Sequence, residues 1–188
     1  MQKSNIFIIS GPSGAGEDSI ISALEKQLPI ERIITTTTRA SRSSEIQGKS
    51  YYFISSGEFE EKLKNGDFAE HAKQYNDNFY GVTKEELRRV QQSGKIGIWK
   101  IEYKGVMSVK KLYPEIKAIL IKTPTLEMLE KRIRLRDNAS DEYIKERMEY
   151  TRQWLRHEDI YDYTVINDDG HLDEAVKEVK KIIEFNKA

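Results

Sequence analysis

The stretch "FIISGPSGAGEDS" (Phe7–Ser19) decides the fold, because an apolar run leads directly into a glycine-rich turn and a helical pattern. The continuous apolar run Ile6–Ile9 is typical of a strand buried on both faces of a parallel sheet. Apolar residues then recur at helical spacing up to Pro29, which predicts a helix over 20–28. A strand, a glycine loop and a helix in this order can point backbone N–H groups and the helix N-terminus at a phosphate.

The glycine loop departs from the phosphate-loop pattern G-x-x-x-x-G-K-[ST] at its two chemical positions. Glu17 stands at the lysine position and Asp18 at the serine or threonine position, with Ser19 next. Two unit charges about 4 Å apart interact by roughly 4 kcal/mol at an effective dielectric of 20, so exchanging lysine for glutamate shifts the balance by up to ~8 kcal/mol. That shift would outweigh an ordinary nucleotide affinity of about 6–8 kcal/mol. Two interpretations stay open: a phosphate loop that needs a cation from elsewhere, or a strand-to-helix turn whose acids only favour the helix N-terminus.

The rest of the chain alternates buried strands with helical patterns, which predicts an α/β fold with a mainly parallel sheet flanked by helices. Strands are expected at 96–103, 117–122 and 163–167, and helices at 85–93, 105–112, 125–135, 141–157 and 172–185. Residues 33–83 break this rhythm with threonine and arginine clusters, a tyrosine pair and one helix, Ser56–Asn65, and are interpreted as an inserted lobe. A second, smaller inserted lobe is expected around "RIRLRDNASDEY".

Composition bounds the function classes. The 188 residues suffice for one domain with a sizeable core. Lysine plus arginine equals aspartate plus glutamate, 31 each, so no overall field would recruit nucleic acid or an anionic membrane. The absence of cysteine excludes disulfides and thiolate chemistry. The first apolar run is too short for a signal peptide, and no stretch is long enough for a membrane span, so a soluble, cytoplasmic protein is expected.

Several stretches carry a family resemblance in their order and spacing: "FIISGPSGAG", "TTTTRASRSSEIQGKSYYF", "GDFAEHA", "NFYGVT", "IEYKGV", "TPTLEMLEKRIRLR" and "YTVINDD". Over roughly residues 5–185 the chain resembles the guanylate kinases. The resemblance implies a core with a parallel sheet of the P-loop NTPase type, an inserted GMP-binding lobe and a small helical lid. It also implies transfer of the terminal phosphate of ATP to GMP with Mg²⁺. On this division the core is 1–32, 84–131 and 157–188, the GMP-binding lobe 33–83 and the lid 132–156.

The resemblance also implies an acceptor site. Arg39 and Arg42 match phosphate-gripping arginines, whose guanidinium forks pair two oxygens at once. Tyr51 and Tyr80 match tyrosines that donate to the same phosphate. Glu70 matches the carboxylate that accepts from guanine N1–H and the amino group. The remaining implied GMP-binding residues are Thr35, Glu45, Val82 and Glu102.

On the donor side, the resemblance implies lid arginines that close over the ATP phosphates and stabilise the charge of the transferred group. They are Arg132, Arg136 and Arg147, although "KRIRLR" alone would also fit a solvated basic helix face. The loop residues implied in ATP binding are Gly11, Ser13, Gly14, Ala15, Gly16, Glu17, Asp18 and Ser19, with Asn167 near the adenine end. Asp18 is the expected carboxylate ligand of Mg²⁺.

Several departures from the family pattern bear on function. Val82 replaces a serine or threonine, Ser41 a proline and Ser50 an aspartate. On the expected strand 96–103, the family carries two acids at alternate positions, where this chain has Lys100 and Glu102. Side chains two apart on a strand share a face, about 6.6 Å apart along it. The carboxyl end of that strand is expected to face the loop. Compared with the family pattern, the loop has lost a lysine and gained an acid, while the strand has lost an acid and gained a lysine.

The leading hypothesis is an ATP-dependent GMP kinase in which Lys100, as a catalytic cation, reaches the β- and γ-phosphates or pairs with Glu17. A structural ion pair in a decayed, ATP-free site stays open. The alternative function is an inactive guanylate kinase-like module that binds a nucleotide or a phosphopeptide. A third hypothesis, motivated by Val82, keeps the enzyme but changes the acceptor. The expected partners are ATP and GMP, without nucleic acid or membrane, and the oligomeric state is left open.

Overall fold

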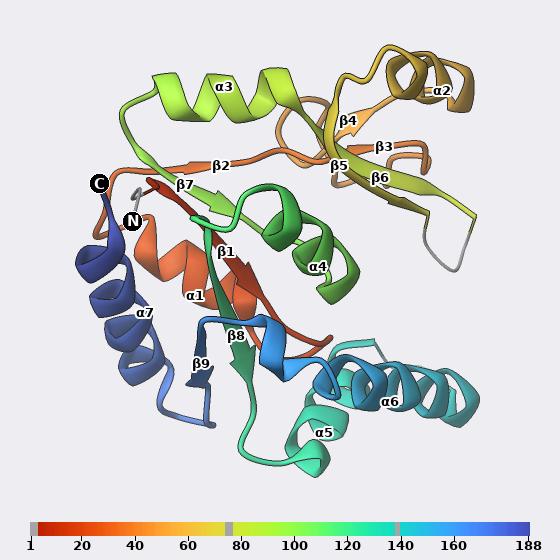
Figure 1. Cartoon of the computed structure of the whole chain (residues 1–188). Coiled ribbons are helices and arrows are strands. Elements are labelled where there is room, and N and C mark those ends of the chain that lie inside the picture. Colours follow the sequence, from red (N-terminus) through yellow and green to blue (C-terminus); the bar gives the residue numbers. More distant parts are fainter. Residues whose placement is uncertain (1–3, 74–76, 138–139) are drawn as a thin grey trace.

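The computed structural model describes residues 4–73, 77–137 and 140–188 (Figure 1). Its core is a five-stranded sheet in the order β2-β7-β1-β8-β9, in which all neighbours are parallel. The strands are β1 (Ile6–Ser10), β2 (Ile30–Arg32), β7 (Ile96–Trp99), β8 (Lys117–Lys122) and β9 (Tyr163–Ile166). The predicted α/β fold with a parallel sheet flanked by helices is therefore confirmed.

Helices cover both faces of this sheet, which explains the continuous apolar run of β1. On one face, Phe7 and Ile9 pack with α1 (Glu17–Leu24) and α7 (Leu172–Asn186). On the other, Ile6 and Ile8 pack with α3 (Lys84–Gln92) and α4 (Tyr103–Leu112). The glycine loop leaves β1 at the carboxyl edge of the sheet, where ligands bind in open α/β folds.

A second, four-stranded sheet in the order β4-β3-β6-β5 lies to one side of the core (Figure 1). It comprises β3 (Thr36–Thr37), β4 (Tyr52–Phe53), β5 (Phe68–Lys73) and β6 (Phe79–Thr83), with α2 (Ser56–Lys64) packed on it. The fully buried Phe59 of α2 stacks on Phe68 and Phe79, with ring centroids 4.3 and 5.3 Å apart. This aromatic cluster gives the second sheet a hydrophobic centre of its own.

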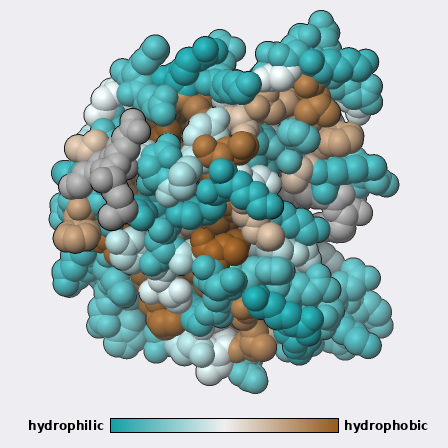
Figure 2. Space-filling view, in the orientation of Figure 1, coloured by the Kyte–Doolittle hydropathy of each residue, from teal (hydrophilic) through white to brown (hydrophobic). Residues whose placement is uncertain are grey.

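Helices α5 (Leu126–Asp137) and α6 (Asp141–Leu155) pack on each other around Leu129, Ile133, Ile144 and Met148. A short 3₁₀ helix, η1 (Glu158–Ile160), then leads into β9. No helix within the three described ranges is long and apolar enough to cross a bilayer. Hydrophilic side chains dominate the face of the molecule in Figure 2, with hydrophobic ones in small groups among them.

Several predicted boundaries were wrong. The predicted strand 96–103 ends at Trp99, because its pairing with β1 stops at Ile8 opposite Trp99 and its pairing with β2 stops earlier. Residues 100–102 therefore form a loop, and the inference that Lys100 and Glu102 share a strand face is wrong. Strand β2 was not predicted. Helix α1 covers 17–24, earlier than the predicted 20–28, and α6 ends two residues before the predicted limit.

Candidate active site

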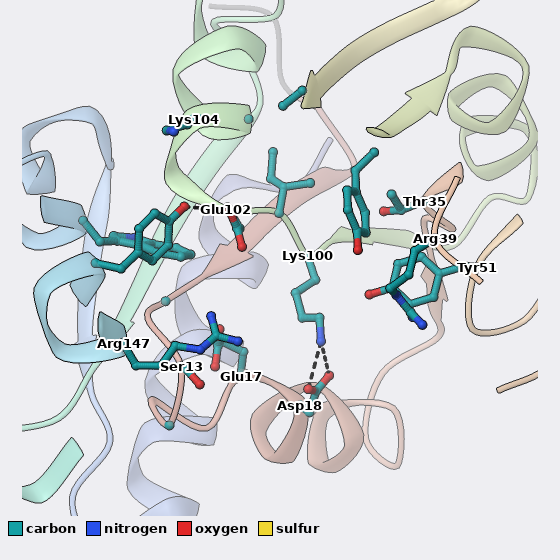
Figure 3. A pocket seen from close by; sticks show the side chains of 18 of the residues that line it. Ser13, Glu17, Asp18, Thr35, Arg39, Tyr51, Lys100, Glu102, Lys104 and Arg147 are labelled. Atoms are coloured by element: carbon teal, nitrogen blue, oxygen red, sulfur yellow. Dashed lines mark hydrogen bonds and ion pairs between the residues drawn. The ribbon is translucent and has the colours of Figure 1, made fainter. Parts of the chain in front are cut away.

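A cavity of about 390 Å³ opens between the glycine loop, the segment 100–105, the second sheet and α6 (Figure 3). It brings together residues that are far apart in the sequence and were predicted to bind two different substrates. The predicted residues that line it are Gly11, Ser13, Gly14, Glu17, Asp18, Thr35, Arg39, Arg42, Glu45, Tyr51, Glu70, Tyr80, Lys100, Glu102, Arg136 and Arg147.

A second cavity, of about 410 Å³, lies on the other side of the glycine loop, against the segment after β9. The predicted residues that line it are Gly14, Gly16, Glu17, Asp18, Ser19, Arg132, Arg136 and Asn167. Glu17, Asp18 and Arg136 border both cavities. Ala15 lines neither cavity, since its side chain is fully buried.

The glycine loop is held in shape by its glycines and by Asn167. Gly14 and Gly16 have φ values of 90° and 96°, a conformation that favours glycine. A Cβ atom on Gly16 would collide with the side-chain nitrogen of Asn167, and this nitrogen donates to the carbonyl of Ala15 at 2.7 Å. Gly16 is the N-cap of α1, so the positive end of the helix dipole borders both cavities.

Glu17, the residue at the lysine position, is held in a partly neutral state. Burial raises the pKa of its carboxyl group to about 7, against the opposing effects of hydrogen bonds from loop amides and of the nearby Lys100. The carboxyl group is therefore substantially protonated near neutral pH. The repulsion of a bound phosphate is accordingly smaller than the ~8 kcal/mol estimated for a full negative charge.

Lys100 reaches the glycine loop from the opposite side of the first cavity (Figure 3). Its ammonium group donates to both carboxylate oxygens of Asp18, at 2.7 and 2.8 Å. The predicted pairing with Glu17 is thus corrected, because the acceptor is the next residue, on the first turn of α1. Both side chains of the pair are largely solvated, with exposed fractions of 44% and 67%. Such a pair stabilises the native state by only about 0–1 kcal/mol, so it opens easily.

Glu45 contacts both of the arginines that were predicted to grip a phosphate, one through its side chain and one through its backbone. Arg39 donates to Glu45 at 2.7 Å, and the other oxygen of Glu45 accepts from the backbone N–H of Arg42 at 2.8 Å. The Arg39 guanidinium also lies over the ring of Tyr51, 5.4 Å from its centroid, and the ring of Tyr80 is 6.2 Å from that of Tyr51. Two arginines and two phenol groups therefore converge on one wall of the cavity.

Glu70 lies in the interior of the same cavity with a buried carboxyl group. Its side chain is 7% exposed, and burial raises its pKa to about 7. Within the described residues it has no protein hydrogen-bond donor, and Gly105 leaves room beside it, since a Cβ there would lie 3.1 Å from the Glu70 oxygen. An unpartnered buried acceptor of this kind suits a ligand that brings its own donors.

Val82 requires a correction as a predicted GMP-binding residue. It pairs with Glu70 across β5 and β6, but its side chain is fully buried and packs in the core cluster that contains Ile33 and Ala69. It lines neither cavity, so its apolar side chain is not a direct contact for a ligand.

The three arginines that were predicted to belong to a lid are distributed over both cavities. Arg136 donates to the hydroxyl of Ser13 at 2.8 Å and so reaches the glycine loop. Arg147 points into the first cavity, where its Nε donates to the hydroxyl of Tyr143. Arg132 lines the second cavity and donates to Asp169 at 2.7 Å and to the carbonyl of Asn167 at 3.0 Å.

Some lining residues were missed by the sequence analysis. Thr151 and Trp154 border the first cavity, as does Tyr150, whose hydroxyl donates to Glu102 at 2.7 Å. Tyr150, Thr151 and Trp154 lie three, four and seven positions after Arg147. Helical spacing therefore places them on the face of α6 that carries this arginine. That spacing was the available signal. Further missed lining residues are Ala72, Lys73, Ile101, Lys104 and Gly105 in the first cavity and Asp168, Asp169, Gly170 and Leu172 in the second.

Among the described residues, no group of three or more potential metal ligands is preassembled. Asp18 is an exposed carboxylate on the first turn of α1, directly after the glycine loop. Mg²⁺ usually keeps several waters and takes one or two protein carboxylates together with substrate phosphates. Asp18 fits that mode of binding, in which the nucleotide supplies most of the ligands.

Comparison with known proteins gives a consistent result. The family model described as guanylate kinase matches residues 3–186. The guanylate kinase of Idiomarina loihiensis is 38% identical over 168 residues, which cover 88% of this chain and 80% of the relative. That of Clostridium tetani is 37% identical over 187 residues, which cover 100% of this chain and 88% of the relative. The crystal structure of guanylate kinase from Anaplasma phagocytophilum has a similar fold, with a TM-score of 0.74 at 23% identity, covering 100% of this chain and 88% of that one.

Proposed function

The chain belongs to the guanylate kinase family, whose members are phosphotransferases, and we propose that it transfers the terminal phosphate of ATP to GMP to form ADP and GDP. The observation that carries the proposal is the position of Lys100, which puts an ammonium group on the glycine loop that lacks its lysine. When the phosphates of ATP enter, they replace Asp18 as the acceptor of the hydrogen bonds that the Lys100 ammonium group donates. Since the exposed pair contributes little to stability, this exchange of partners is inexpensive.

The acceptor nucleotide is proposed to occupy the first cavity. Arg39 and Arg42 grip its phosphate, and the hydroxyls of Tyr51 and Tyr80 donate to the same group. The buried Glu70 carboxylate accepts from guanine N1–H and the amino group, which are the donors that its surroundings lack. Thr35 and Glu102 line the same cavity and complete the base and ribose contacts.

Transfer is proposed to be in line, with no covalent intermediate, so catalysis consists of positioning and electrostatic stabilisation. Lys100, Arg136 and Arg147 surround the space where the transferred group must pass. Arg132 and Asn167 line the second cavity, where the remainder of ATP is proposed to lie. Mg²⁺ is proposed to bind Asp18, and when bound it neutralises phosphate charge.

A second candidate function is a binding module that holds GMP or a phosphopeptide without transfer. The observation that favours it is the internal neutralisation of the loop, where Asp18 already satisfies Lys100 and Glu17 carries a partial negative charge. A loop of this kind no longer needs to bind ATP as a phosphate donor. This candidate retains the acceptor cluster but predicts no turnover of ATP.

The deciding experiment follows ADP formation from ATP and Mg²⁺, with and without GMP, in parallel with GMP binding by calorimetry. GMP-dependent ADP formation supports the kinase. GMP binding without ADP formation supports the binding module. A panel of other nucleoside monophosphates tests acceptor choice, and faster turnover of any of them than of GMP would contradict the proposed substrate.

A further inference from the structure

Glu102 occupies the N-cap position of α4, but its side chain does not cap the helix. A carboxylate at this position would ordinarily accept from free N–H groups of the first turn, helped by the helix dipole. Instead, one of its oxygens accepts from the hydroxyl of Tyr150 at 2.7 Å. Glu102 is thereby turned away from its own helix and into the first cavity.

The donor in this contact is held firmly. The ring of Tyr150 packs against Trp154, one helical turn along α6, with centroids 6.1 Å apart, and against Tyr103 at 5.9 Å. The indole N–H of Trp154 donates to the hydroxyl of Tyr161 at 2.9 Å, which fixes the helix to the core. Burial and the nearby Glu102 raise the pKa of Tyr150, so its hydroxyl remains a proton donor throughout the neutral range.

The contact joins two parts of the molecule that the proposed reaction uses differently. Tyr150 belongs to α6, the helix that also carries Arg147, whereas Glu102 lies on the acceptor side of the cavity. A carboxylate that is oriented in advance binds a ligand more tightly than one that must be ordered on binding.

We infer that Tyr150 is a positioning residue whose hydroxyl holds the Glu102 carboxylate in place for the acceptor nucleotide. The inference rests on the proposed binding of GMP in the first cavity. It assigns a role to a residue that lines the cavity and acts on the acceptor through Glu102. A purely structural hydrogen bond between α6 and the core would instead affect the folded state and both substrates alike.

The test measures GMP binding by calorimetry without ATP, so its result does not depend on transfer. Tyr150→Phe removes only the hydroxyl, and Glu102→Gln keeps the size of the acceptor but removes its charge. Each is expected to weaken GMP binding about tenfold, the scale of a charge-assisted hydrogen bond. The double variant is expected to bind no more weakly than the weaker single variant, because the two residues act as one unit.

Tyr163→Phe is the matched control, since it removes a hydroxyl that contacts Asn186 away from both cavities. It is expected to bind GMP as the unchanged protein does. In the kinase assay, Tyr150→Phe is expected to raise KM for GMP and leave KM for ATP unchanged. Three outcomes would overturn the inference. Tyr150→Phe could bind GMP as tightly as the wild type, the double variant could show additive losses, or both KM values could rise equally. Absence of turnover with this binding pattern intact would count against the proposed function alone.

Discussion

Replacing Lys100 by methionine removes the ammonium group and keeps most of the length of the side chain. An ammonium and a phosphate oxygen about 4 Å apart attract by roughly 4 kcal/mol at an effective dielectric of 20. Because the Lys100 side chain is 44% exposed, solvent screens part of this attraction, and about 3 kcal/mol is a reasonable expectation. At about 1.4 kcal/mol per factor of ten, kcat/KM for ATP should fall roughly a hundredfold.

The same substitution should leave the fold and the acceptor site intact. The exposed pair with Asp18 contributes about 0–1 kcal/mol to stability, so the melting temperature should change little. GMP binding should be unchanged, because its proposed contacts lie elsewhere in the cavity. The matched control is Lys95→Met, which removes a lysine of similar exposure (48%) that pairs with Glu31 at 3.0 Å outside both cavities. It should not alter the kinetics.

The assay is ADP formation at varied ATP and saturating GMP, with GMP binding measured separately. Adding Glu17→Lys to the Lys100→Met variant moves the cation back to the glycine loop and should recover much of the lost kcat/KM. Unchanged ATP kinetics in Lys100→Met would refute the reasoning, because the loop would then work without this cation. Equal losses for ATP and GMP would refute it as well, since they would indicate a general disturbance of the cavity.

The other predictions concern pH and the glycine loop. The pKa values of Glu17 and Glu70 are raised from 4.5 to about 7. Between pH 4.5 and about 7 the folded chain therefore binds more protons than the unfolded chain. The melting temperature should fall as the pH rises through that range. In kinetics the two groups should act in opposite directions: KM for GMP rises as pH falls below about 7 because Glu70 loses its charge, whereas KM for ATP falls because Glu17 becomes neutral. Gly16→Ala should destabilise the protein and weaken ATP binding, since the residue has a φ of 96° and a Cβ would strike Asn167. Gly57→Ala in α2, where no atom lies within 4 Å of the added Cβ, should instead stabilise it by about 0.5–1 kcal/mol, as thermal unfolding would show.

The core of the fold could be predicted because its signals are local. The apolar run Ile6–Ile9 and the glycines after it define a buried strand and its turn without reference to any other segment. The end of β7 could not be predicted in this way. The apolar Ile101 continues the strand pattern, but the strand stops at Trp99 because its neighbours offer no further partners. Strand ends of this kind depend on residues distant in sequence.

The candidate site shows the same division. Arg39, Arg42, Tyr51 and Tyr80 were identified from short motifs that resemble the family. In the structure all four line the first cavity, Tyr80 from β6 and the others from the segment between β3 and β4. The partner of Lys100 could not be identified from the sequence, because Glu17 and Asp18 are adjacent in the chain but point in different directions from the first turn of α1. Only the helix geometry assigns the contact to Asp18. Tyr150 was missed because its role depends on Glu102, 48 positions earlier in the chain.

Glu17 and Glu70, the two cavity-lining carboxyl groups whose pKa values are raised, bear on whether the glycine loop is a working site or a remnant. Burial raises the pKa of Glu17 and of Glu70 to about 7, so ionisation of either group destabilises the ligand-free fold. Glutamine would fit the same space without that penalty. Packing gives no reason for an acid at position 70, because no protein donor within the described residues satisfies the Glu70 carboxyl group. Unfavourable titratable groups in a cavity are characteristic of sites whose ligand supplies the missing interaction. For Glu70 that ligand must bring donors. For Glu17, the nearby Lys100 opposes the rise in pKa but does not cancel it, so the altered loop also keeps an unfavourable titratable group at this site.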